Sequence, residues 1–257
     1  MKQHLIETES TNVWLMSLAR ERRRAGAPLS DMHAVYTDFQ SAGRGAGTNK
    51  WHSSRGLNIL ASFYFETGLA ASDQFLFNLW FATATRAFLA RHAPEVRIKW
   101  PNDIYVRDHK LAGDLTEHAV SGGRLDFTVA GIGINVNETV FPSWIPNPTS
   151  LRQLTGNVYD VAALMDEYLA VLRERRPMLG TDHAAQLRDE YMTHLYRLHE
   201  PHPYLIKGQE MTCTLRDIDH FGRLVLELPD GTRQAFGFKE VGYVADSTSS
   251  ACPQQGQ

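Results

Sequence analysis

The sequence lacks the features that mark several classes of protein. Its 257 residues include only two cysteines, Cys213 and Cys252, which excludes a disulfide framework and the paired CxxC spacing of a zinc site. No apolar run approaches the roughly 18 residues of a membrane-spanning helix, and the first residues contain no apolar signal core. We therefore expect a cytoplasmic protein that makes no contact with a membrane.

Surplus charge of either sign is also scarce. The formal net charge is −3, so the chain lacks the strongly basic face of a bulk nucleic-acid binder. One basic run, 22–24, falls in the last turns of a predicted helix, where it suits the helix C-terminus and indicates a solvated face rather than an anion site. The eleven histidines are scattered and predict no metal centre.

Helical and β-type segments are mixed along the first 200 residues. The predicted elements are helices at 8–26 and 72–92, strands at 33–39 and 57–65, four short strands between 96 and 137, a short helix at 150–156, and two helical pieces between 158 and 199. The stretch "SGGR" at 121–124 predicts a hairpin turn. The pattern favours an α+β fold with a mixed sheet flanked by helices.

The C-terminal part has a different composition. Residues 201–209, "PHPYLIKGQ", are interpreted as a linker, and three β-type runs that follow predict a small β-barrel. The polar C-terminal end predicts disorder. We expect a large domain over 1–200, a small β domain over 205–245 and a disordered tail over 246–257.

Residues 40–51, "QSAGRGAGTNKW", predict a flexible cationic loop. Glycine permits sharp turns and close approach of the backbone to a ligand, and successive N–H groups can hold an anion. Arg44 adds a planar fork that matches phosphate or carboxylate, and Lys50 adds a second charge. The GxxxxGK[ST] template fails because Trp51 follows the lysine, and GxGxxG fails at Thr48. Alone, the loop is explained equally well as plain surface.

Two further stretches carry candidate polar chemistry. In "KWPNDIYV", 99–106, Asn102 and Asp103 precede a strand, either as an Asx turn or as ligands for a magnesium ion. In "KLAGDLTE", 110–117, Lys110 begins a strand. Its ammonium either faces solvent or neutralises charge on a reacting carboxylate and phosphate.

The stretch "GIGINVN" at 131–137 contains no polar side chain before Asn135. Gly131 and Gly133 alternate with isoleucines, and glycines two residues apart clear one face of a strand. A flat ligand could lie against that backbone. A tight crossing of two strands is the alternative.

In this order, the stretches resemble the motifs of the biotin–protein ligase family. "TESTN", "QSAGRG", "KWPNDI", "KLAG" and "GIGINVN" follow the family's order and approximate spacing, over most of residues 8–156. The resemblance implies a catalytic domain like those of class II aminoacyl-tRNA synthetases, followed by an SH3-like C-terminal domain. It also implies ATP-dependent conversion of biotin to biotinyl-5′-AMP with Mg²⁺, then transfer of biotin to one lysine of a biotin carboxyl carrier protein.

The resemblance assigns roles residue by residue. The catalytic residues would be Lys110 and Arg44. Biotin would contact Ser10, Thr11, Asn12, Gln40, Gly43, Arg44, Gly45, Ala46, Lys110, Gly131 and Gly133. The nucleotide would contact Arg44, Trp51, Asn102, Asp103, Lys110 and Asn135, with Asp103 also sharing the Mg²⁺. Trp51 would either close over the ligand or anchor the loop.

The chain departs from the family pattern at two positions. Ala46 stands where many members carry a second basic residue or glutamine, which predicts a leakier adenylate. Asp114 stands where an aliphatic residue is usual, and we expect it to pair with Lys110 or to face solvent. No helix-turn-helix pattern precedes the first motif, so we expect no specific DNA binding. The resemblance leaves a homodimer open. Lipoate–protein ligase chemistry and a non-catalytic biotin or nucleotide sensor are the alternatives.

Overall fold

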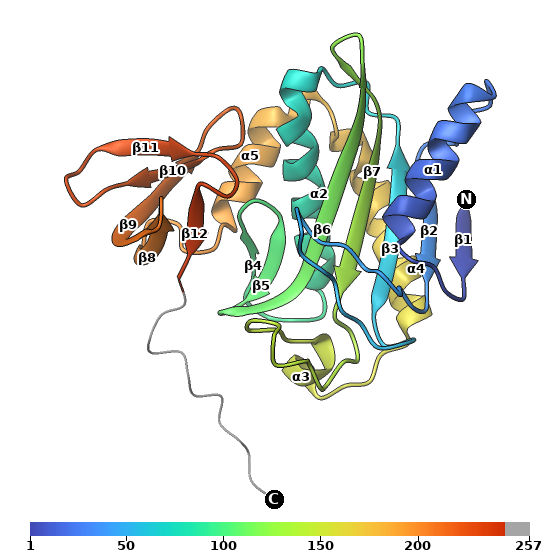
Figure 1. Ribbon diagram of the computed structural model, residues 1–257, viewed down its shortest axis with the longest axis horizontal. Helices are drawn as coiled ribbons and strands as arrows, with labels where there is room; N and C mark the ends of the chain where they lie inside the picture. Colours follow the sequence, from blue (N-terminus) through green and yellow to red (C-terminus); the bar gives the residue numbers. More distant parts are fainter. Residues whose placement is uncertain (245–257) are drawn as a thin grey trace, which may run out of the picture.

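The computed structural model describes residues 1–244 and contains two β-sheets, the larger of them covered by helices (Figure 1). The predicted tail at 246–257 lies outside the described residues. The larger sheet has the strand order β1-β2-β3-β7-β6-β5-β4. Its strands are β1 (Lys2–Leu5), β2 (His33–Thr37), β3 (Ile59–Phe65), β4 (Val96–Lys99), β5 (Asp103–Val106), β6 (His109–Ser121) and β7 (Arg124–Ile134).

This larger sheet is mixed, as predicted. β1 runs parallel to β2, and the other neighbouring strands run antiparallel. β6 and β7 form a long hairpin whose turn contains Gly122 and Gly123, both at positive φ, so the predicted "SGGR" turn is confirmed. The sequence did not predict β1, because this half-exposed edge strand lacks β-branched residues and a clear apolar alternation.

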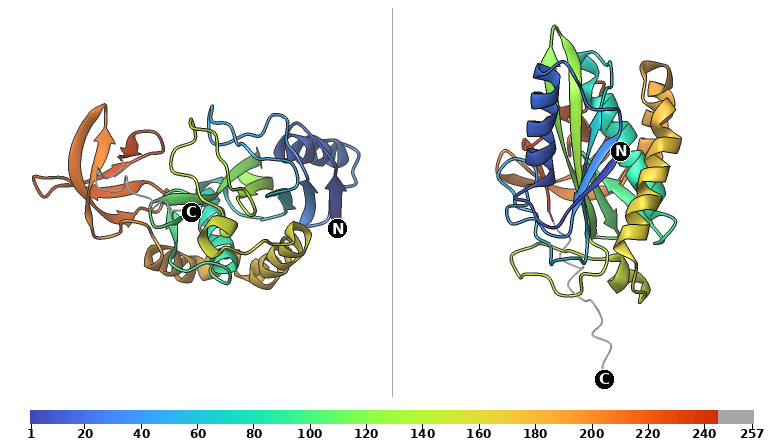
Figure 2. Two further views of the ribbon diagram at one scale, coloured as in Figure 1. Left: turned by 90° about the horizontal axis from the view of Figure 1, so that it is seen from below. Right: turned by 90° about the vertical axis from the view of Figure 1, so that its right-hand side faces the viewer.

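Five α-helices in the described part of the chain pack around this sheet. They are α1 (Thr11–Arg24), α2 (Gln74–Leu89), α3 (Leu151–Thr155), α4 (Val161–Arg175) and α5 (Ala184–Thr193), with one-turn helices η1 (Ala71–Asp73), η2 (Arg176–Met178) and η3 (Thr181–His183). α1 covers one face of the sheet, and α2 and α4 cover the other (Figure 2). The predicted helices are therefore confirmed. None of those in residues 1–244 has the length and apolar character that a bilayer span requires.

The main hydrophobic core lies between the sheet and the α2/α4 layer. The aromatic residues of α2 belong to it: Phe77, Trp80 and Phe81 are fully buried and pack against Phe65 of β3. Aromatic burial of this kind contributes more apolar area per residue than any other. A second, smaller cluster lies under α1. The sheet is thus held rigid from both sides.

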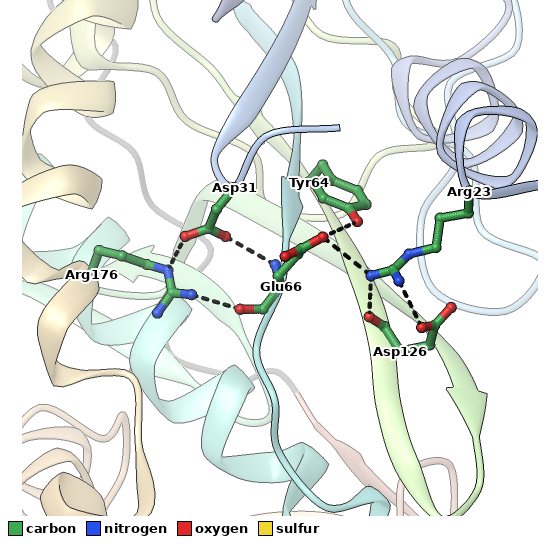
Figure 3. Close-up of polar contacts among 6 residues, drawn as sticks. All are labelled: Arg23, Asp31, Tyr64, Glu66, Asp126 and Arg176. Carbon is green, nitrogen blue, oxygen red and sulfur yellow. Dashed lines mark hydrogen bonds and ion pairs between the residues drawn. The ribbon is translucent and has the colours of Figure 1, made fainter. Parts of the chain in front are cut away.

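A polar network fastens the helix ends to one end of the sheet (Figure 3). Arg23 of α1 donates to the Asp126 carbonyl at 2.7 Å and lies 3.3 Å from a carboxylate oxygen of Glu66. Arg176 of η2 donates to Asp31 and to the Glu66 carbonyl, each at 2.8 Å. The solvated-face prediction for the basic run was therefore wrong for Arg23, which is half-buried because the end of the sheet supplies acceptors.

The smaller sheet has the strand order β11-β10-β9-β8-β12. Its strands are β8 (Pro201–Ile206), β9 (Gln209–Ile218), β10 (Leu224–Glu227), β11 (Arg233–Phe236) and β12 (Val241–Tyr243). The predicted C-terminal β module is confirmed, but the linker predicted at 201–209 is wrong because β8 lies there. Pro201 and Pro203 are tolerated in β8 because the neighbouring strand β12 pairs only with residues 204–206. Neither proline therefore needs an N–H group on the side that faces β12.

The smaller sheet packs against the larger part of the molecule through close backbone contacts. Trp100 Nε1 donates to the Gly222 carbonyl at 2.8 Å. A Cβ added at Gly222 would lie 2.3 Å from the Phe75 ring, so only glycine fits against α2 there. These contacts bring β12 toward the end of β4 and β5.

Candidate active site

A cleft of about 240 Å³ opens at the face of β6 and β7 that carries α1. It gathers segments that are far apart in the sequence: the N-terminus of α1, loop 40–51, turn 100–103, the glycines of β7, and β12. All but two of the predicted site residues line it, namely Ser10, Thr11, Asn12, Gln40, Arg44, Gly45, Ala46, Trp51, Asn102, Asp103, Lys110, Gly131 and Gly133. The exceptions are Gly43 and Asn135.

The N-terminus of α1 supplies polar groups that are fixed by the protein. Thr11 donates through its backbone N–H to Gln40 Oε1 at 2.8 Å, and its hydroxyl lies 3.2 Å from the same oxygen. Ser62 Oγ lies 2.8 Å from Thr11 Oγ1 and 2.7 Å from Asn12 Oδ1. Ser10 is the N-cap residue in extended conformation, yet its side chain makes no capping hydrogen bond. Its buried hydroxyl is therefore available to a ligand in the cleft.

Glycines form the floor of the cleft. The register pairs Gly113 of β6 with Gly133 of β7, and Leu115 with Gly131. A Cβ added at Gly131 would lie 2.3 Å from Asn12 Oδ1, so a larger residue would collide with the α1 groups. The alternating glycines keep this strand face free of its own side chains, and Asn12 and Trp51 occupy the space above them.

The Trp51 ring lies against Gly133. A Cβ added at Gly133 would lie 2.2 Å from Trp51 Cε2. The Trp51 backbone N–H donates to the Gly43 carbonyl at 2.9 Å, and a Cβ at Gly43 would lie 2.5 Å from the Trp51 carbonyl oxygen. The Trp51 ring therefore rests on the strand, and the Trp51 backbone joins the two ends of the loop through Gly43.

Arg44 sits at the edge of the cleft. Its guanidinium Nη1 lies 3.6 Å from Glu117 Oε1, and the Arg44 side chain is 45% exposed. The loop is a hairpin, in which the Gly45 N–H donates to the Asn49 carbonyl at 2.8 Å. Glu117 also accepts from Asn12 Nδ2 at 3.0 Å. The arginine is thus paired with a carboxylate of β6, beside the α1 groups.

Lys110 and Asp103 form an ion pair inside the cleft. Lys110 Nζ lies 2.8 Å from Asp103 Oδ1 and 5.7 Å from the centroid of the Trp51 ring. Gly113 makes room for the pair, because a Cβ there would lie 2.9 Å from Lys110 Nζ. The predicted cation and the predicted metal-binding carboxylate are therefore neighbours beside the glycine floor.

Asp114 behaves differently from either expectation. It neither pairs with Lys110 nor faces solvent: it is 6% exposed, and its Oδ1 has no hydrogen-bond partner among the described residues. Burial raises the pKa of the Asp114 carboxyl well above its ordinary value, Asp103 raises it further, and Lys110 opposes the shift. The prediction was wrong because Lys110 is already paired with Asp103. Burial therefore favours the uncharged form of this carboxyl.

A second hollow of about 360 Å³ adjoins the cleft and shares Trp51, Lys99, Asp103 and Lys110 with it. Its far wall is the segment 141–148, including the largely exposed Trp144. Asn135 faces this hollow and not the first. The Asn135 amide donates to the Thr149 carbonyl at 2.9 Å, which fastens the segment that follows this wall.

Sequence reasoning missed several cleft residues. They are Asn49, Lys99, Trp100, Pro101, Leu115, Ile132 and, from the smaller sheet, Phe238, Val241 and Tyr243. Lys99, Trp100 and Pro101 adjoin the quoted "KWPND" stretch, so that motif could have indicated them. The residues from 238 onward show only strand alternation, and no local signal places them beside a loop 190 residues earlier.

Known proteins are similar to this chain in both sequence and fold. Residues 15–135 match the model of the biotin/lipoate A/B protein ligase family. The bifunctional ligase/repressor BirA of Bacillus spizizenii is 30% identical over 252 residues, which cover 92% of this chain and 73% of that protein. The chain belongs to the biotin protein ligase family. The matched range contains the glycine loop, the Lys110–Asp103 pair and the glycine floor.

Two other comparisons cover the full length of a relative. The biotin–[acetyl-CoA-carboxylase] ligase of Paracoccus denitrificans is 29% identical over 245 residues, covering 92% of this chain and 98% of that protein. The structure of a biotin protein ligase from Aquifex aeolicus in complex with biotin and ATP has a TM-score of 0.71 at 23% identity, covering 95% of this chain and 99% of that chain. The predicted fold, including the C-terminal β module, is thereby confirmed.

Proposed function

We propose that the chain activates biotin with ATP and transfers it to a lysine of a biotin carboxyl carrier protein. In the first step, a carboxylate oxygen of biotin attacks the α-phosphorus of ATP, and the bond to the β-phosphate oxygen breaks to release pyrophosphate. In the second step, the ε-amine of the carrier lysine attacks the acyl carbon. An amide bond forms, the acyl–oxygen bond breaks, AMP leaves and the amine proton passes to solvent.

One observation carries this proposal: two hollows meet at a shared set of cationic groups. Biotin would lie in the glycine-floored cleft, since its flat bicyclic head needs a cleared strand face and fixed polar groups at one end. Ser10, Thr11 and Gln40 supply those groups. The purine nucleoside would lie in the adjoining hollow, past Trp51. The carboxylate and the α-phosphate would then meet at Lys110, which lines both hollows.

Lys110 would promote the first step electrostatically. Two anions repel each other as they approach, and an ammonium fixed between them lowers the energy of the charged transition state. In the unliganded protein, Asp103 satisfies this ammonium at 2.8 Å, which holds it in place before substrate arrives. The side chain therefore needs little reorganisation when the anions bind.

Mg²⁺ would accompany the triphosphate. Magnesium in nucleotide sites is usually bound through one or two carboxylates together with phosphate oxygens. Asp103 is partly exposed at the junction of the hollows, and its carboxylate could supply a protein oxygen ligand for the ion. The Asn102 side chain lines the cleft beside it. The ion would neutralise phosphate charge when bound.

Arg44 and its loop would retain the intermediate. On ligand binding, the guanidinium would leave Glu117 for the more strongly charged phosphate, and the loop would fold over the adenylate and exclude water. Ala46 lines the same cleft and contributes no charge. A faster release of biotinyl-5′-AMP than in arginine-rich relatives is therefore expected.

The carrier partner would be a biotin carboxyl carrier domain of a biotin-dependent carboxylase. Its lysine must enter the open side of the cleft after pyrophosphate has left. A homodimer, a cytoplasmic location and the absence of specific DNA binding stay predictions.

ATP–pyrophosphate exchange tests the proposal. The chain should catalyse exchange that depends on biotin, and it should label a carrier domain with radioactive biotin but leave a carrier whose target lysine is replaced by arginine unlabelled. Exchange that depends on lipoate instead of biotin would indicate the related ligase chemistry. Biotin binding with neither exchange nor label would indicate a sensor and would overturn the proposal.

A further inference from the structure

Lys99 is a cationic side chain of the site that the chemistry above does not use. It lines both hollows, beside Asp103 and Lys110. Lys99 Nζ donates to Tyr105 Oη at 3.0 Å. The same nitrogen lies 4.6 Å from the centroid of the Tyr105 ring and 4.7 Å from that of Tyr243, which comes from β12. Two aromatic faces and one phenol oxygen thus hold the ammonium in place.

The charge of Lys99 lacks a close counter-ion. Within residues 1–244, no carboxylate lies within the 4.0 Å of a salt bridge to its ammonium. Lys110 is paired with Asp103 at 2.8 Å and Arg44 with Glu117 at 3.6 Å, whereas Lys50, which also lines both hollows, is exposed to solvent. Burial lowers the pKa of Lys99 to about 8, although Asp103 acts in the opposite direction. A bound anion would compensate this charge.

The position of Lys99 indicates which anion would bind to its ammonium. Lys110 adjoins the glycine floor, since a Cβ at Gly113 would touch it. The Lys99 ammonium contacts Tyr105, which lines the second hollow, and Tyr243, which lines the cleft, so it lies where the two hollows meet. Because Lys110 is assigned to the carboxylate and the α-phosphate, an anion at Lys99 would be the part of the triphosphate that Lys110 does not contact, within the hollow proposed for the nucleotide.

We propose that Lys99 binds the β- and γ-phosphates of ATP and holds the departing pyrophosphate. This inference rests on the proposed function, because the anion is the leaving group of its first step. The P–O bond between the α- and β-phosphates breaks with its electron pair on the β-phosphate oxygen, and Lys99 stabilises that added charge. The carrier-transfer step, which involves no pyrophosphate, should not need Lys99.

The test compares Lys99→Gln, Lys99→Arg and a surface control, Lys207→Gln, which removes an exposed lysine from the β8–β9 turn. The first variant should weaken inhibition by Mg-pyrophosphate and raise the KM for ATP on the order of 10- to 100-fold, the usual worth of a hydrogen bond to a charged group. Biotin affinity and carrier labelling from supplied biotinyl-5′-AMP should stay within about twofold of wild type. The arginine variant should recover most of the pyrophosphate sensitivity, and the control should match wild type.

Unchanged pyrophosphate inhibition in Lys99→Gln would overturn the inference, as would an equal loss of labelling from the supplied adenylate. If that variant does not fold, the wild-type chain provides a second test. Pyrophosphate, but not biotin, should protect Lys99 from acylation by an amine-reactive reagent, and mass spectrometry measures the extent of acylation. Equal acylation with and without pyrophosphate would contradict it. A wild-type chain without biotin-dependent exchange would refute the proposed function separately.

Discussion

Replacing Gly131 with alanine should displace a whole group of fixed polar side chains. The new Cβ would lie 2.3 Å from Asn12 Oδ1 and 3.2 Å from Ser62 Oγ. Because a carbon and an oxygen in contact need more than 3 Å, Asn12 must retreat by roughly 1 Å. It then loses or weakens its hydrogen bonds to Ser62 at 2.7 Å, to the Leu115 carbonyl at 2.9 Å and to Glu117 at 3.0 Å.

The magnitude follows from those three bonds. Two neutral hydrogen bonds contribute about 1 kcal/mol each, and the one to a carboxylate contributes about 1.5–3 kcal/mol. Since relaxation will recover part of this sum, we expect Gly131→Ala to lower the free energy of unfolding by roughly 2–4 kcal/mol. For a chain of this length, that lowers Tm on the order of 10 °C. Biotin affinity should fall as well, because the displaced side chain moves into the cleft.

Thermal and urea unfolding measure the effect, with Gly180→Ala as the matched control. A Cβ at Gly180 meets nothing within 4 Å, and the backbone there is extended. In the double variant with Asn12→Ala, the clash disappears, so its cost should equal that of Asn12→Ala alone. Additive costs, or a Gly131→Ala variant as stable as the Gly180 control, would refute the assigned collision.

Three further predictions follow from the site and its surroundings. Lys110→Ala should reduce the rate of adenylate formation by roughly 10²–10³-fold in rapid-quench assays, and a variant with near-normal turnover would contradict the assigned role. Glu117→Gln should free Arg44 from its 3.6 Å ion pair and slow the release of biotinyl-5′-AMP by up to about fivefold in filter binding, whereas faster release would contradict the competition between carboxylate and phosphate. Burial lowers the pKa of His118 from about 6.5 to about 4, so the unfolded chain binds a proton that the native state excludes. Stability should therefore fall by up to roughly 3 kcal/mol as the pH drops from about 6.5 to about 4; urea unfolding should show a flatter pH dependence for His118→Gln, and identical slopes would contradict the assignment.

The sequence indicated the elements of the fold well where local pattern and burial agree. The apolar spacing of α2 and the glycine turn of the β6–β7 hairpin are both local signals, and the structure has both. β8 was missed because its prolines suggest a linker. They are tolerated because β12 is short and pairs only with residues 204–206. Nothing within residues 201–206 indicates how many residues β12 will pair with.

The site was predictable only where motifs are contiguous. Lys110 and the alternating glycines stand in recognisable stretches, and the cleft brings them together. The resting position of Trp51 on Gly133 depends on how the loop folds back, and the burial of Asp114 depends on its tertiary surroundings. Tyr243 joins the site only because the smaller sheet docks, so no spacing in the sequence could indicate it.

A crystal structure with biotin and a non-hydrolysable ATP analogue tests the central claim most directly. We predict the biotin ring in the cleft beside Thr11 and Gln40, its carboxylate and the α-phosphate within hydrogen-bond distance of Lys110, and the purine in the hollow beyond Trp51. Biotin or nucleotide bound elsewhere, with the Lys110 ammonium still paired only to Asp103, would contradict it.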